Sequence, residues 1–215
     1  MIVAIDGPAG AGKSTVARAL ARKLGLRFLD TGAMYRAVAL EVLRRGEEPA
    51  SAQACGRVAR ELELAFGEGG RIRIDGRPGE PAIRSGEVTA AVSAVSAHRE
   101  VRAAIVRRQR ELAREWGGLV AEGRDTTTVV FPDAEHRFYL DASPAERARR
   151  RAHELGEPGR EGEIRVEMEC RDRLDSSREL SPLRLGEGVV RIDTNGLGPD
   201  EMVERVLAHL HGGRG

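Results

Sequence analysis

The residues with the clearest chemical potential form one short segment near the N-terminus, where the chain reads Gly-Pro-Ala-Gly-Ala-Gly-Lys-Ser over positions 7–14. This segment matches the G-x-x-x-x-G-K-[ST] pattern of a phosphate-binding loop and lies between a strand pattern and a helix pattern. Glycines let consecutive backbone N–H groups turn toward phosphate oxygens, and the positive end of the next helix adds to the attraction. Lys13 is then expected to reach the β- and γ-phosphates, and the Ser14 hydroxyl to bind Mg²⁺. The residues predicted to hold the triphosphate are Gly7, Pro8, Ala9, Gly10, Ala11, Gly12, Lys13, Ser14 and Thr15.

A phosphate-binding loop does not by itself distinguish a switch, a motor and a kinase. Guanine-reading GTPases need an Asn-Lys-x-Asp segment, and neither Lys13 nor Lys23, the only lysines, lies in one. Motor ATPases and helicases usually bring a longer chain and an apolar strand followed by Asp-Glu, which this sequence lacks. The chemistry therefore depends on the arginines and acids elsewhere in the chain.

Arginines and acids gather at three further places. Residues 30–36, Asp-Thr-Gly-Ala-Met-Tyr-Arg, open a predicted helix, and Glu-Gly-Arg-Asp at 122–125 closes a predicted strand. Arg171, Asp175 and Arg178 follow with spacings of four and three, which places them on one face of a predicted helix. On an ordinary surface this trio is an ion-pair stripe, whereas near a phosphate-binding loop it can bind a second ligand that carries its own phosphate.

Five short apolar runs are predicted to be strands buried on both faces of a sheet. They cover residues 2–5, 27–29, 119–121, 137–140 and 189–192, and the polar residues that follow them are Asp6, Asp30, Glu122, Asp141 and Asp193. Amphipathic segments such as 14–25 and 34–46 lie between them, and this alternation predicts a parallel sheet with helices on both faces. Ligands bind such sheets at the carboxyl ends of the strands, where all five acids fall.

Two stretches depart from this alternation. Residues 61–66 and 71–75 alternate polar with apolar around a glycine-rich turn, which predicts a half-exposed hairpin packed on the edge of the main sheet. Helical patterns at 87–97 and 99–116 follow it. Residues 147–184 are rich in arginines and acids. This zone is either a solvated helical hairpin with ion pairs or a mobile flap that brings arginines to a ligand, and composition favours the hairpin.

Length and composition fit one globular domain, with 215 residues, 40% apolar and 32% charged. A balance of 35 basic and 34 acidic residues gives a net charge of +1, so we expect no nucleic-acid or membrane partner. No apolar stretch approaches the length of a membrane span, and the first residues do not resemble a signal peptide, so we expect a cytoplasmic protein. We interpret Cys55 and Cys170 as packing residues. The histidines are interpreted as surface or packing residues: His98, His136, His153, His209 and His211.

In order and spacing, these segments together resemble the bacterial cytidylate kinases. The resemblance is carried by residues 5–14, 30–36, 83–85, 101–102, 123–125 and 129–134, and by Arg171-Asp172 with Asp175 and Arg178. It implies an α/β P-loop fold in three layers with a five-stranded parallel sheet, a monophosphate-binding insert with a β-hairpin, and a short lid. The implied division is a core of residues 1–48, 117–146 and 179–215, an insert of about 49–116 and a lid of about 147–171. The implied reaction is transfer of the γ-phosphoryl group of ATP to CMP or dCMP with Mg²⁺, by a protein that we expect to be a monomer.

The resemblance also implies roles for individual residues. Lys13, Arg124 and Arg171 are implied to be catalytic. Arg36 and Arg124 match positions that bind the acceptor phosphate, with Arg84 and Arg171 nearby. The base is assigned to Thr31, Ser93, Arg102, Asp125 and Arg178, the sugar to Asp175, and Tyr35 is also counted as substrate-binding. Either Glu122 or Asp125 is expected to hold metal-bound water. The chain departs from the family at Thr31, where serine is common, and at Thr126-Thr127, where an apolar residue and glycine are usual.

A nucleoside monophosphate attacks through an oxygen that is already ionised, so catalysis needs positioning and charge neutralisation rather than a strong base. Three alternatives remain at this point. Another acceptor, such as AMP, UMP or a small metabolite like shikimate, would keep the loop and change the set of arginines. A regulatory protein would hydrolyse ATP slowly without stimulation by an acceptor. A protein without enzymatic activity would bind no nucleotide.

Overall fold

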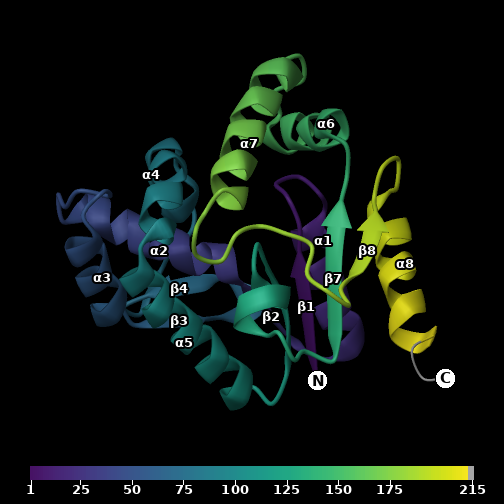
Figure 1. The fold of residues 1–215 in the computed structure, drawn as a ribbon, viewed down its shortest axis with the longest axis horizontal. Helices are drawn as coiled ribbons and strands as arrows, with labels where there is room; N and C mark the ends of the chain where they lie inside the picture. The colour runs from purple at the N-terminus through teal and green to yellow at the C-terminus, as the bar shows by residue number, and fades with distance from the viewer. Residues whose placement is uncertain (213–215) are drawn as a thin grey trace. The chain divides into compact units, whose positions relative to one another are not determined.

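The structure is a computed structural model that describes residues 1–212, with side chains described up to Leu210. The end of the predicted core, residues 213–215, and the side chain of His211 lie outside the described residues. The main sheet contains β1 (Ile2–Asp6), β2 (Arg27–Asp30), β6 (Leu119–Gly123), β7 (His136–Asp141) and β8 (Val190–Asp193), in the order β2-β6-β1-β7-β8 (Figure 1). All five strands were predicted from their apolar runs, and the α/β fold with a five-stranded parallel sheet is confirmed.

The register of the parallel strands brings their carboxyl ends together. Asp6 at the end of β1 pairs with Gly123 of β6, and Asp141 of β7 pairs with Asp193 of β8. The strands between these ends are buried on both faces, as the fully buried Val3, Ala4 and Ile5 of β1 show. The loops that follow the strands therefore begin at one edge of the sheet, as the sequence predicts.

Among the described residues, four α-helices and one π-helical turn lie outside residues 28–117. The helices are α1 (Lys13–Leu24), α6 (Pro144–Leu155), α7 (Glu161–Ser176) and α8 (Pro199–Gly212), and the π-helical turn covers Thr126–Val130. α1 buries Val16 and Leu20 and packs against β6 and α8. α6 and α7 pack through Ala148, Ala152, Ile164 and Met168. The zone at 147–184 thus contains the helical hairpin, and its exposed faces carry ion pairs such as Arg165 with Glu169.

After the last three residues of β2, residues 28–117 hold mostly helices and one small sheet. Their elements are α2 (Thr31–Arg44), α3 (Ala52–Glu61), β3 (Leu64–Phe66), the 3₁₀ turns Glu68–Gly70 and Ala82–Arg84, β4 (Ile72–Ile74), β5 (Arg77–Pro78), α4 (Gly86–Ala97) and α5 (Arg99–Glu115). β3, β4 and β5 form a separate antiparallel sheet. The predicted hairpin is half-exposed, because Leu64 and Ile72 are buried while Arg73 is exposed. The hairpin gains β5 as a third strand, and its expected packing on the edge of the main sheet stays a prediction.

The sequence did not predict α3, whose apolar positions include Cys55 and Val58 and whose N-terminus is capped by the Ser51 side chain. The polar-apolar alternation read as strand from Glu61 onward begins in the last turn of this helix, so the strand starts later than predicted. Cys55 is buried, as expected. Cys170 is exposed on α7, so its interpretation as a packing residue is wrong.

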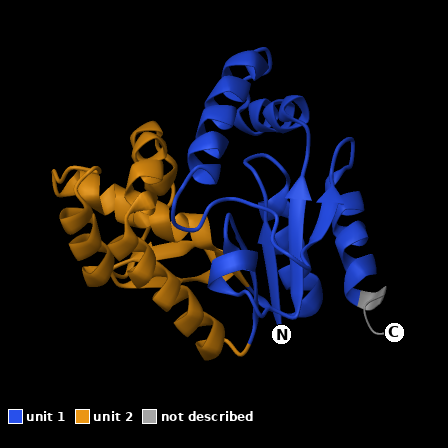
Figure 2. Ribbon diagram, viewed as in Figure 1, with its two compact units in different colours: residues 1–27, 118–215 blue, residues 28–117 orange. Residues whose placement is uncertain are grey.

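The chain forms two compact units, one of residues 28–117 and the other of residues 1–27 with the described residues from 118 onward (Figure 2). We call them the insert unit and the loop unit, after the predicted insert and the phosphate-binding loop that they contain. The finer division into core, insert and lid stays a prediction. Within residues 1–212, no helix has the length and apolar character that crossing a membrane requires.

Candidate active site

Gly7 and Gly10 of the phosphate-binding loop have positive φ angles and surroundings that leave no room for a side chain. Gly7 has φ +147°, and a Cβ there would lie 2.1 Å from the carbonyl oxygen of Leu140. Gly10 has φ +72°, and a Cβ there would lie 2.8 Å from the carbonyl oxygen of Arg147. The loop is therefore packed against β7 and α6 at distances that exclude any side chain.

Four carbonyl groups of the loop accept hydrogen bonds from side chains of surrounding elements. The pairs are Arg124 Nη1 with Gly7 O at 2.9 Å, Lys13 Nζ with Pro8 O at 2.7 Å, Arg147 Nη1 with Ala9 O at 2.9 Å, and Thr194 Oγ1 with Ala11 O at 3.2 Å. These bonds occupy carbonyl oxygens of the loop and hold its backbone in place. The N–H groups of such a loop are the groups that bind phosphate.

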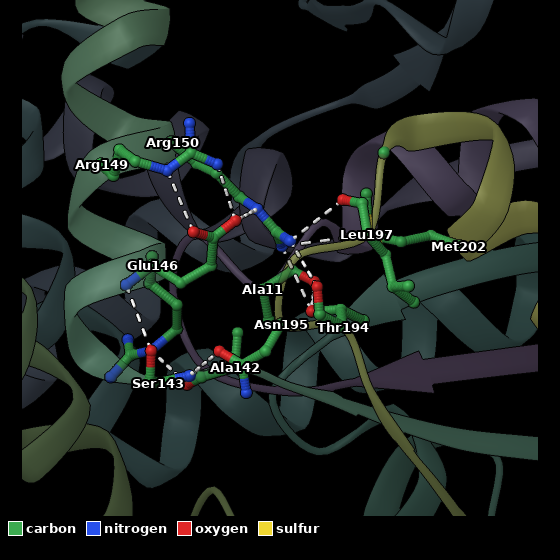
Figure 3. Close-up of polar contacts among 12 residues, drawn as sticks. Ala11, Ala142, Ser143, Glu146, Arg149, Arg150, Thr194, Asn195, Leu197 and Met202 are labelled. Atoms are coloured by element: carbon green, nitrogen blue, oxygen red, sulfur yellow. Dashed lines mark hydrogen bonds and ion pairs between the residues drawn. The ribbon is translucent and has the colours of Figure 1, made fainter.

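Arg150 of α6 binds the segment after β8, which in turn contacts the phosphate-binding loop (Figure 3). Arg150 donates to Thr194 Oγ1 at 3.2 Å and to the carbonyl oxygen of Leu197 at 3.3 Å, while its Nε donates to Glu146 at 2.9 Å. Thr194 in turn donates to Ala11 of the loop. The sequence analysis did not single out Arg150 or Thr194, because no spacing pattern links them.

Arg124 and Asp175, both predicted site residues, form an ion pair. Arg124 Nε lies 2.8 Å from Asp175 Oδ2, and Arg178 binds the other oxygen of Asp175. Burial alone would raise the pKa of Asp175, but Arg124 and Arg178 hold it below its usual value. The prediction that all three residues of the 171–178 trio share a helix is wrong, because α7 ends at Ser176 and Arg178 follows it. Both carboxylate oxygens of Asp175 are bound by arginines, so a contact with the sugar stays a prediction.

Arg171 differs from its neighbours. Its Nε is buried and has no hydrogen-bond partner among the described residues. Burial, together with the like charge of Arg124, lowers the pKa of Arg171 to about 10. A buried cation beside a second cation is unfavourable unless an anion joins them. This arrangement suits a phosphate group.

Lys13, like Arg171, is a buried cation whose pKa is lowered by burial and by the charge of Arg124. The two effects lower the pKa of Lys13 to about 7. In this structure Nζ donates to the loop carbonyl of Pro8. A phosphate between Lys13 and Arg124 would offset the repulsion between them.

Asp6, the last residue of β1, is fully buried and is bound by the two threonines at which the chain departs from the family. Oδ1 accepts from the N–H of Thr126 at 2.8 Å and from its hydroxyl at 2.7 Å. Oδ2 accepts from the N–H of Thr127 at 2.7 Å and from its hydroxyl at 2.6 Å. These four bonds join the start of the phosphate-binding loop to the segment after Arg124 and Asp125, and they give Thr126-Thr127 a physical role.

We expect Thr127→Val to lower the free energy of unfolding by about 1.5–3 kcal/mol, because it removes a buried hydrogen bond to a carboxylate. Thr128→Val is the matched control, since the Thr128 hydroxyl is buried without a hydrogen-bond partner among the described residues. Urea unfolding of both variants checks this expectation. Equal stability of the two variants would contradict the role of Thr127.

The insert unit contains the other predicted substrate residues. Arg36 on α2 is buried, and its Nη1 donates to the carbonyl oxygen of Ile83 at 3.2 Å and to Thr89 Oγ1 at 2.9 Å. The Arg102 guanidinium lies over the ring of Tyr35, 5.3 Å from its centroid. The structure therefore brings Tyr35 and Arg102 together, and two hydrogen bonds of Nη1 orient the Arg36 side chain.

Three further predicted residues lie in the same unit. Arg84 is half-exposed and binds Asp30 Oδ2 at 2.8 Å, while Asp30 Oδ1 caps α2. Thr31 is buried in the first turn of α2, and Ser93 is partly buried on α4. The sequence analysis placed Asp30 at the end of a strand and the start of a helix without assigning it a capping role, although an acidic side chain directly before a helix is the signal for a cap.

The donor set around the loop can be compared with the needs of Mg²⁺. The described residues contain no group of three or more His, Cys, Asp or Glu side chains that could hold a metal ion. Ser14 is exposed in the first turn of α1, and Glu122 and Asp125 are buried at and just after the end of β6. Such a set fits Mg²⁺, which is usually held by substrate phosphates and water with one or two protein ligands.

Comparison with known proteins gives a consistent result. The family model described as "Cytidylate kinase" matches residues 3–212. A cytidylate kinase of Caldanaerobacter subterraneus is 47% identical over 207 residues, which are 95% of this chain and 92% of that protein. A bifunctional pantoate ligase/cytidylate kinase of Synechococcus sp. (strain RCC307) is 47% identical over 96% of this chain, which spans only 42% of that longer protein.

Among solved structures, an uncharacterized protein from Eubacterium ventriosum matches with a TM-score of 0.55 at 12% sequence identity. The match covers 99% of this chain and 98% of that chain. At this identity the likeness concerns the fold alone.

Proposed function

The chain belongs to the cytidylate kinase family, and on this basis we propose that it transfers the γ-phosphoryl group of ATP to CMP or dCMP, giving ADP and CDP or dCDP. The observation that carries the proposal is the buried Arg171 Nε, which has no hydrogen-bond partner among the described residues and lies in the same unit as the phosphate-binding loop. Such a site has positive charge to place on phosphate. A reaction in which the acceptor oxygen is already ionised needs this charge more than it needs a general base.

In this proposal the chain acts by positioning and charge. Residues 7–15 bind the triphosphate of ATP, and Lys13 neutralises its β- and γ-phosphates. Arg124 and Arg171 place positive charge on the transferring group, while Arg36 and Arg84 bind the acceptor phosphate. The base is assigned to Thr31, Ser93, Arg102, Asp125 and Arg178, with Tyr35 beside Arg102 and the sugar at Asp175.

Mg²⁺ belongs to the proposal as an ion that would reduce the negative charge of the phosphates. Ser14 would hold it directly, and either Glu122 or Asp125 would hold its water. Asp6 is a poor candidate, because both its oxygens are already bound by threonines. We further propose that the protein works in the cytoplasm as a monomer, without a nucleic-acid partner.

A panel of acceptors in one assay that couples ADP formation to a colour change tests the proposal. We expect CMP and dCMP to stimulate ADP formation, and UMP, AMP and shikimate to do so poorly. Slow ADP formation that no acceptor stimulates would favour a regulatory protein. Equal stimulation by AMP or UMP would leave only the broader class of nucleotide kinases.

Arg36→Ala is expected to raise the KM for CMP about 10- to 150-fold, which corresponds to the 1.5–3 kcal/mol of a charged hydrogen bond. The KM for ATP should change little, because the triphosphate is assigned to the loop unit. Arg44→Ala is the control, since Arg44 lies on the same helix with its side chain 55% exposed. An equal loss for both nucleotides would indicate a folding defect or a different role for Arg36.

A further inference from the structure

Asp172 of α7 has no role in the reaction described above, yet its carboxylate contacts the phosphate-binding loop. Oδ1 accepts a hydrogen bond from the N–H of Ala9 at 3.1 Å, and Oδ2 accepts one from Arg147 Nη1. The same Arg147 nitrogen donates to the carbonyl oxygen of Ala9 at 2.9 Å. One ion pair therefore binds both backbone polar groups of Ala9 and closes a ring of hydrogen bonds at the loop.

The surroundings of this carboxylate are strongly cationic. Arg124 Nη2 lies 3.7 Å from Asp172 Oδ1, and Arg147 and Arg124 have side chains only 7% and 16% exposed. Asp172 itself is 13% exposed. A loop N–H and two largely buried guanidinium groups are also the partners that a phosphate oxygen takes in a phosphate-binding loop. The carboxylate thus has the charge and the contacts of a bound phosphate oxygen.

We propose that Asp172 takes the place of a phosphate oxygen in the ligand-free protein, and that a phosphate group of the nucleotide displaces it. The phosphate then takes over the N–H of Ala9 and the charges of Arg147 and Arg124. Asp172 acts in this scheme as an internal competitor of the phosphate, because it occupies these three groups until the ligand arrives. The inference rests on the proposed binding of ATP by the loop and adds a competitor for that binding.

This scheme and a purely structural role of Asp172 predict opposite changes in phosphate affinity when Asp172 is removed. If Asp172 only braces the loop, its removal disorders Ala9 and weakens phosphate binding. If Asp172 competes with phosphate, its removal leaves Arg147, Arg124 and the Ala9 N–H without their internal anion. Phosphate binding then becomes tighter, although the ligand-free protein loses stability.

Calorimetric titration of the full chain tests the proposal, with ATP and inorganic tripolyphosphate as probes in the absence of added metal ion. We expect Asp172→Ala to lower the Kd for both probes about tenfold, since a competing charged contact is removed. Steady-state assays should show a lower KM for ATP with an unchanged KM for CMP. Glu169→Gln is the control, because Glu169 lies one turn away on α7 and pairs only with Arg165 among the described residues.

Asp172→Asn provides a second variant in case the alanine variant does not fold. It keeps an oxygen for the N–H of Ala9 but removes the charge, so we expect tighter binding of both probes here as well. A folded variant that binds tripolyphosphate with unchanged or weaker affinity would overturn the inference. If the unmodified protein fails to bind ATP, the proposed function itself fails, so the two failures are distinct.

Discussion

Lys13→Ala should abolish phosphoryl transfer while the protein remains folded. Lys13 is expected to meet the β- and γ-phosphates, where negative charge shifts during transfer, so its loss affects the transition state more than ground-state binding. Loss of one such charge contact commonly reduces turnover by about 10²–10³-fold or more. Both kcat and kcat/KM should fall together, which is the signature of a contact made mainly in the transition state.

The structure changes the reason why this variant should fold. A lysine in a loop is commonly exposed and contributes little packing, whereas the side chain of Lys13 is buried. A buried ammonium group whose pKa is lowered to about 7 is held at a cost in solvation, so its removal should not destabilise the chain.

The other lysine offers a matched control for this variant. Lys23 is half-exposed and binds Glu204 at 2.6 Å, so Lys23→Ala should keep full activity. Thermal unfolding followed by circular dichroism, with kcat measured on the same samples, checks both variants. A Lys13→Ala protein with normal kcat would show that the loop does not serve the reaction.

The elements that the sequence predicted correctly are those whose signal is local. The strand of Ile2–Asp6, the loop and α1 follow from a short apolar run, a glycine pattern and an amphipathic period, and all three lie where the pattern placed them. α3 was missed although Cys55 and Val58 have the spacing of a buried helix face and Ser51 is a cap residue. Most of the buried residues in this face are small, so the apolar signal is weak.

The contacts that sequence reasoning missed join positions far apart in the chain. Asp172 meets Ala9 across 163 residues, and Thr127 meets Asp6 across 121 residues. Their residue types are common, and no fixed spacing connects them, so a single sequence contains no signal for either pair. Asp6 could be placed at the edge of the sheet by its strand, but its partners depend on how the segment after β6 turns back.

The second large effect that we expect is a preference for CMP over UMP. We expect kcat/KM for CMP to exceed that for UMP by a factor of up to about 10⁴–10⁵. Cytosine presents an amino donor at N4, whereas uracil presents an oxygen at the same place. Asp125, which the family resemblance assigns to the base, is a buried carboxylate at 4% exposure. A buried acceptor that loses its donor and faces an oxygen instead is strongly unfavourable, because neither group can be satisfied.

Asp125→Asn should therefore shrink the ratio of kcat/KM for CMP to that for UMP, because an amide can donate to the uracil oxygen. Much of the change should come from improved use of UMP, which a general folding defect cannot produce. Asp133→Asn, an exposed change eight residues further along the same segment, should leave the ratio unchanged. The ratio is measured in the coupled assay with both acceptors at several concentrations. An unchanged ratio in Asp125→Asn would move base recognition to other residues, whereas a shift toward UMP identifies this carboxylate as the group that distinguishes an amino group from an oxygen.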